Sequence, residues 1–122
     1  MHAEALHHPV ALPELRAPYH AETVLLPAGG APFAGDFVVS ACAEEGRRLS
    51  VALVDVSGKG VEAGTRSLLL SGALGGLLGA LPAEAFLPAA NAYLFAQDWE
   101  EGFATAAHLS LDLETGCYAI ES

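Results

Sequence analysis

Two apolar, strand-like runs with an aspartate at each outer end constrain this chain more than any other feature of its sequence. Residues 36–43 read DFVVSACA, residues 49–56 read LSVALVDV, and the polar residues 44–47 separate them. A short polar turn that contains glycine between two β-prone runs predicts an antiparallel hairpin, with the glycine at the position that needs a positive φ. In such a hairpin the first residue of one strand lies beside the last residue of the other. The spacing therefore predicts that Asp36 and Asp55 meet at one edge of a sheet.

Two helices are predicted after this hairpin. A stretch rich in Leu, Ala and Gly predicts the first over residues 61–81, and its small residues suit close approach to another backbone. The second is predicted over residues 82–97, with Pro82 in its first turn. The expected buried face of the second helix consists of Leu87, Ala90, Tyr93 and Leu94.

Further strands are predicted on both sides of this region. A short strand over residues 23–26 and a loop over 28–32 precede the hairpin, and strands over 103–111 and 117–120 follow the helices. The order of strands, two helices and strands predicts the α+β class with a mainly antiparallel sheet. A last strand at the end of the chain leaves an open sheet edge. We therefore expect either that the C-terminal part of the fold is missing or that a second copy completes it as a homodimer.

The composition limits the partners of the chain. Its 122 residues are 52% hydrophobic and carry a formal net charge of −10, which fits one globular domain and excludes a disordered tail. A surface of that sign repels phosphate backbones and anionic lipids, so we expect no nucleic acid and no membrane as a partner. The uncharged run over residues 67–81 is also shorter than the roughly 20 residues of a membrane span. A phosphorylated substrate is compatible with this charge only if a cation lies between the two, so a divalent metal is the first cofactor to consider.

The N-terminus and the cysteines point to an ordinary intracellular chain. Residues 1–18 are rich in His, Pro and Ala, which predicts a flexible segment, and they lack the basic and apolar regions of a secretory signal. A cytoplasmic location is the default expectation. Cys42 and Cys117 lie in apolar, strand-like runs, and we expect small buried side chains there rather than a disulfide or a metal pair.

Several residue types could carry chemistry. Hard divalent cations take oxygen ligands, so Asp36 and Asp55 are candidate metal ligands; the alternative is a pair of ordinary strand-end aspartates that face water. Residues 57–60 (SGKG) lack the full pattern of a phosphate-binding loop and predict a strand-to-helix turn. His20 and His108 are expected to be packed or surface side chains rather than catalytic bases.

Two motifs around the aspartates resemble those of a known family. Leu26-Pro27-Ala28 with Ala34-Gly35-Asp36-Phe37, and later Asp55-Val56-Ser57-Gly58-Lys59-Gly60-Val61, are similar to the opening motifs of protein phosphatase 2C (PPM-type) serine/threonine phosphatases, in the bacterial sporulation and stress-response branch. The resemblance covers residues 19–122, in the order of the family. It implies that this segment is the N-terminal part of a phosphatase 2C-like domain, an α-β-β-α sandwich of antiparallel sheets flanked by helices.

The resemblance also implies a site and a reaction. In the family two Mn²⁺ or Mg²⁺ ions lie at the sheet edge, which implies that Asp55 bridges both ions, that Asp36 ligates one of them and that Val56 contributes its backbone carbonyl. The implied activity is hydrolysis of phosphoserine or phosphothreonine on a regulatory protein, such as an anti-sigma-factor antagonist, by a metal-activated water.

The chain departs from the family pattern in two ways. Ala34 stands where the family usually has glycine, and the remaining aspartate ligands of the family would lie after the last predicted strand. The alternative function is therefore a catalytically inactive, phosphatase-like domain that binds partners. The two helices resemble a pair that repositions to complete the metal site, and movement of this pair is a hypothesis.

Overall fold

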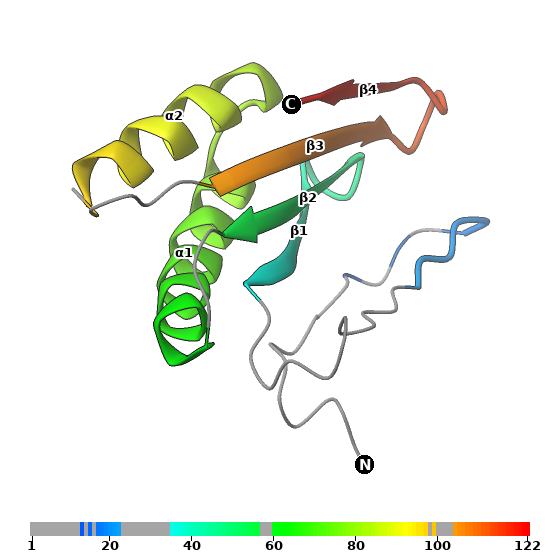
Figure 1. The fold of residues 1–122 in the computed structure, drawn as a ribbon. Helices are drawn as coiled ribbons and strands as arrows, with labels where there is room; N and C mark the ends of the chain where they lie inside the picture. The colour runs from blue at the N-terminus through cyan, green and yellow to red at the C-terminus, as the bar shows by residue number, and fades with distance from the viewer. Residues whose placement is uncertain are drawn as a thin grey trace, which may run out of the picture.

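The structure consists of one antiparallel sheet that carries two helices on one of its faces (Figure 1). The computed structural model describes residues 13, 15, 17–22, 35–56, 60–97, 99 and 104–122, with the side chains of 60–63 excepted. In these residues the sheet order is β1-β2-β3-β4 and each neighbouring pair is antiparallel. The elements are β1 (Asp36–Ala43), β2 (Arg48–Val56), α1 (Gly60–Ala80), α2 (Ala83–Ala96), β3 (Ala104–Asp112) and β4 (Tyr118–Glu121). The predicted α+β class with an antiparallel sheet is confirmed.

The predicted boundaries agree with the structure to within one or two residues where the chain is described. β2 begins at Arg48 instead of residue 49, and each helix ends one residue earlier than predicted. Pro82 is the residue before α2 and adopts an extended conformation (φ −60°, ψ 155°), so it occupies the N-cap position instead of the first turn. The predicted strand over 23–26, the loop over 28–32, most of the segment 1–18 and most of the turn over 57–60 lie outside the described residues.

The turn between β1 and β2 contains more residues with a positive φ than the sequence suggested. Gly46 has the predicted positive φ of 85°, but Glu44 and Glu45 also adopt left-handed conformations, with φ of 55° and 56°. The turn closes through a hydrogen bond of 3.1 Å from the Arg47 N–H to the Glu44 carbonyl. The Glu44 side chain also accepts a hydrogen bond of 3.0 Å from Arg48 Nε. These contacts hold Glu44 in a conformation that residues with a Cβ rarely adopt.

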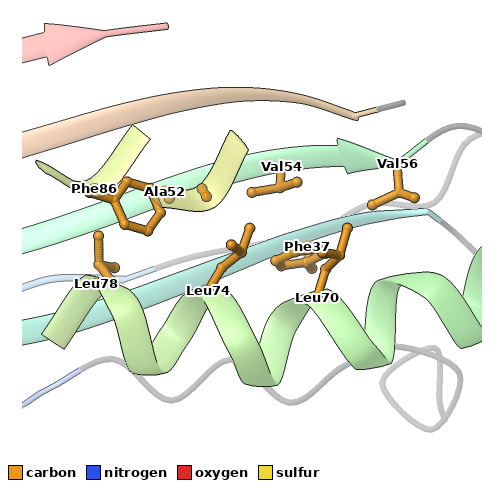
Figure 2. Close-up of a cluster of buried hydrophobic side chains, with 9 residues drawn as sticks. Phe37, Ala52, Val54, Val56, Leu70, Leu74, Leu78 and Phe86 are labelled. Carbon is orange, nitrogen blue, oxygen red and sulfur yellow. The ribbon is translucent and has the colours of Figure 1, made fainter. Parts of the chain in front are cut away.

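The core lies between the helices and the sheet. Leu70, Leu74 and Leu78 follow each other at intervals of four residues along α1, so they share one face, and Figure 2 shows them pointing toward the sheet. There they meet Phe37 of β1 and the inward side chains of β2, chiefly Val54. Burial of such aliphatic and aromatic side chains contributes roughly 1.5–3 kcal/mol each before entropy is counted.

Small residues bring α1 close to β1. A Cβ built on Gly75 would lie 3.8 Å from Val39 Cγ1, and one built on Gly79 would lie 3.6 Å from Ala41 Cβ. Gly72 and Gly76, by contrast, face open space. The expectation that small residues serve a close approach therefore holds for one face of the helix only.

The buried face of α2 differs from the predicted one in one residue that the prediction left out. Phe86 and Ala90 are its buried residues, and Phe86 was not expected among them. Leu87, Tyr93 and Leu94 pack at the border of the core and are only partly buried. Pro88 lies inside the helix on its exposed side.

The two cysteines behave differently from each other. Both are free thiols, as predicted, but Cys42 is only half-buried and Cys117 is exposed. The expectation of a buried Cys117 is wrong because β4, which follows it, is an edge strand whose four residues are all exposed. Among the described helices, none combines the length and hydropathy that crossing a membrane requires.

Candidate metal centre

Asp36 and Asp55 face each other at the open end of the β1–β2 hairpin. They are direct cross-strand partners in the register of the two strands, which is the arrangement that the hairpin predicts. Phe37, Val54 and Val56 are buried toward the helices. Because side chains alternate between the faces of a strand, the two aspartates lie on the opposite, helix-free face, where both are exposed. The two carboxylates therefore lie next to each other at the sheet edge.

The electrostatics of this pair favour a cation. Partial burial raises the pKa of the Asp36 carboxyl above its usual range, and the negative charge of Asp55 together with a hydrogen bond to it raises the pKa further. Like charges placed directly opposite in an antiparallel pair destabilise the sheet. A divalent cation between the carboxylates would reverse this effect, because each carboxylate would then face a positive charge.

Gly35 places the backbone of Val56 against the start of β1. The Val56 N–H donates a hydrogen bond of 3.3 Å to the Gly35 carbonyl. A Cβ built on Gly35 would overlap the carbonyl oxygen of Val56, so no other residue fits here without moving that oxygen. The side chain of Val56 is buried in the core, 3% exposed. Only the backbone of Val56 is therefore available to a ligand at this edge.

A shallow hollow of about 370 Å³ adjoins the two aspartates. Its lining includes Asp36 and Asp55 together with Leu53 and Thr105. Thr105 is the cross-strand partner of Asp55 on β3 and its side chain is exposed. A hydroxyl group beside the carboxylate pair is a further oxygen ligand or hydrogen-bond donor. Sequence reasoning missed this residue as a member of the site.

The donor set fits a hard divalent cation. Mg²⁺ and Mn²⁺ prefer carboxylate, carbonyl and water oxygens, and Mg²⁺ usually keeps several waters with only one or two protein carboxylates. The described residues hold no group of three or more His, Cys, Asp or Glu side chains suited to a metal ion. Within the described part of the chain, the candidate ligands are thus the carboxylates of Asp36 and Asp55, the Val56 carbonyl and the Thr105 hydroxyl.

The two described histidines differ in burial, and the register places His108 away from the aspartate pair. His108 is buried in the middle of β3, where it pairs in register with Ala52. His20 is exposed, and its Nε2 lies 2.9 Å from Glu22 Oε1. Each was expected to be a packed or a surface side chain, and His108 is the packed one while His20 lies at the surface.

Comparison with known proteins identifies the family. The model of the family described as stage II sporulation protein E (SpoIIE) matches residues 45–121, which is more than half of the chain and includes Asp55, both helices, β3 and β4. No curated protein matches the chain significantly. The match covers the Asp55 motif and agrees with its resemblance to the phosphatase 2C-like sporulation branch, whereas the Asp36 motif lies before the matched residues. The chain belongs to the SpoIIE family.

Proposed function

We propose that this chain is part of a metal-dependent phosphatase that hydrolyses phosphoserine or phosphothreonine on a regulatory protein. The observation that carries the proposal is the direct pairing of Asp36 with Asp55 at the open end of the hairpin. Family membership supports it, because residues 45–121 match a phosphatase-related family. The proposed cofactor is a pair of Mn²⁺ or Mg²⁺ ions.

Each residue of the site has a distinct task in this proposal. Asp36 and Asp55 would hold the cations through their carboxylates. Gly35 keeps the Val56 carbonyl oxygen at the sheet edge, where it supplies a neutral ligand. The exposed Thr105 hydroxyl, next to Asp55 in register, orients a water molecule or a phosphoryl oxygen by hydrogen bonding. When bound, the metal ions supply Lewis-acid polarisation and lower the pKa of water.

The charge of the chain supports a cation at this site as well. A protein with a net charge of −10 repels a phosphorylated substrate unless positive charge lies between the two. The proposed substrate is a cytoplasmic phosphoprotein of the anti-sigma-factor antagonist type.

Substitution of Asp55 by asparagine tests the proposal. Asp55→Asn keeps the shape of the side chain but removes the negative charge, so we expect Mn²⁺ affinity to fall at least tenfold, by about 1.4 kcal/mol or more. Release of phosphate from a phosphoserine peptide should fall to background. Titration calorimetry with Mn²⁺ and a phosphate-release assay measure the two effects. The matched control is Glu114→Gln, which changes an exposed acid in the β3–β4 turn. Unchanged Mn²⁺ binding in Asp55→Asn would remove this residue from the site.

The second candidate is a catalytically inactive, phosphatase-like domain that binds partners. It is favoured by the small number of carboxylates that the described residues bring together. The two candidates differ in turnover. A chain that binds a phosphorylated partner but releases no phosphate at saturating Mn²⁺ is a binding domain, whereas release that depends on Asp36 and Asp55 identifies the enzyme.

A further inference from the structure

A buried histidine lies between the sheet and α2. His108 is only 1% exposed, and its Nε2 has no hydrogen-bond partner among the described residues. Its ring packs against the ring of Phe86 on α2, with the centroids 4.9 Å apart and the planes tilted by 56°. Phe86 is in turn one of the two residues that α2 buries. The contact that attaches this part of α2 to the sheet is therefore also the contact that shields an ionisable group from water.

The helix that rests on His108 depends on this packing. No side chain caps the N-terminus of α2, and Pro88 interrupts its hydrogen-bond ladder from within. A helix of 14 residues with such features is marginal in water without tertiary contacts. Loss of the Phe86 contact should consequently weaken the docking of the whole helix and not merely loosen one side chain.

The charged groups around His108 oppose each other in their effect on its protonated form. Glu121 of β4 is its cross-strand partner and favours the charged ring, whereas Arg48 of β2 opposes it. Arg48 is itself engaged, because it donates to Ser50 Oγ at 2.7 Å and to the Leu81 carbonyl at 3.2 Å. On α2 the titratable side chains are Glu84 and Tyr93, and on α1 the described cation is Arg66, which lies 4.8 Å over the Trp99 ring. Burial, Glu121 and Arg48 therefore decide the charge state of His108.

We propose that His108 makes the attachment of α2 to the sheet pH-dependent, holding the helix when the imidazole is neutral and releasing it when the imidazole binds a proton. An imidazolium ion placed against the Phe86 ring, with an unpartnered nitrogen, loses its hydration without a compensating hydrogen bond. Undocking of α2 lets water reach the ring and removes this cost. The proposal is independent of the phosphatase activity, because His108 lies away from the aspartate pair.

The direction of the effect follows from proton linkage. Burial lowers the pKa of His108 below its usual value of 6.5, while Glu121 counteracts this in part and Arg48 adds to it. In the undocked state the ring is in water and its pKa returns toward the usual value. The undocked state therefore binds the proton first as the pH falls below about 6.5. Docking of α2 should weaken from that pH down to the lower pKa of the docked state.

Amide hydrogen exchange at two pH values tests the proposal. Between about pH 7.5 and pH 5, exchange of the α2 amides, corrected for the intrinsic rate, should rise about tenfold for each unit by which burial lowers the pKa. The amides of α1 and of the β1–β2 hairpin should keep their protection. The variant His108→Leu, which cannot bind a proton, should lose this pH dependence. The matched control His20→Leu removes an exposed histidine and should retain it.

A second readout covers the case in which His108→Leu does not fold. The pKa of His108 in the unmodified chain, measured from its ring C–H resonance by NMR, should lie below the usual value of 6.5. Three results would overturn the proposal. These are a His108 pKa at or above 6.5, an α2 exchange rate that does not change with pH, and loss of protection in α1 and the sheet at the same pH as in α2.

Discussion

Gly35 allows β1 to lie close to the backbone of Val56, and this close approach positions the proposed metal site. A methyl group there would overlap the Val56 carbonyl oxygen, so Gly35→Ala must push β1 and the end of β2 apart. We expect a loss of about 1–3 kcal/mol of stability, typical of overpacking, and weaker Mn²⁺ binding, because the Asp36 and Asp55 carboxylates would separate. Urea denaturation and Mn²⁺ titration calorimetry measure the two effects.

Gly72→Ala is the control for this prediction. It adds the same methyl group at a position inside α1 where a Cβ meets open space, so it should stabilise the chain by up to about 1 kcal/mol and leave metal binding unchanged. Equal effects of the two substitutions on Mn²⁺ affinity would show that Gly35 does not position the site.

The site could be predicted from the sequence only in part. The pairing of Asp36 with Asp55 follows from the length of one turn and the alternation of two strands, because both are local features. Thr105 could not be predicted in the same way. It reaches Asp55 through the pairing of β2 with β3, and no short turn fixes the register of two strands that are separated by two helices.

At the scale of elements, the β1–β2 turn contains a residue whose backbone conformation is unfavourable, so a substitution there can raise stability. Glu45 has a φ of 56°, which is costly for a residue with a Cβ but not for glycine. We expect Glu45→Gly to raise the free energy of unfolding by about 0.5–1 kcal/mol, as measured by chemical denaturation. Glu114→Gly, in the β3–β4 turn where no positive φ is found at that position, should lower stability instead. A loss of stability in both variants would contradict this interpretation of the turn.

The buried face of α2 includes Phe86, which the prediction left out. Phe86 lies four residues before Ala90, so helical periodicity alone places the two on one face. The structure adds the neighbours of this residue: Phe86 lies beside Leu78 of α1 in the core (Figure 2), and its ring packs against that of His108 on β3. The contact with His108 depends on how two helices sit on a sheet, which a single-helix pattern does not contain.

At the scale of the whole molecule, the excess of negative charge should make stability depend on salt. A net charge of −10 on 122 residues gives self-repulsion that mobile ions screen. We expect the melting temperature at pH 7 to rise by a few degrees between about 20 and 200 mM NaCl. The same series near the sequence pI of about 4.6 is the control, and the rise should disappear there. A melting temperature at pH 7 that falls over this salt range would show that attractive ion pairs outweigh the repulsion.

The separation of β2 from β3 along the chain has a consequence for the order of folding. β1 with β2, and β3 with β4, are each joined by a short turn, whereas the chain between β2 and β3 makes both helices. Closing a short loop costs less entropy than closing a long one, so each hairpin should form early and the two should join late. Asp36 and Asp55 would then lie side by side as soon as the first hairpin forms. Thr105 would reach them only when α1 and α2 have packed on the sheet and β3 has paired with β2. Assembly of the hollow beside the aspartates should therefore coincide with the last cooperative step of folding.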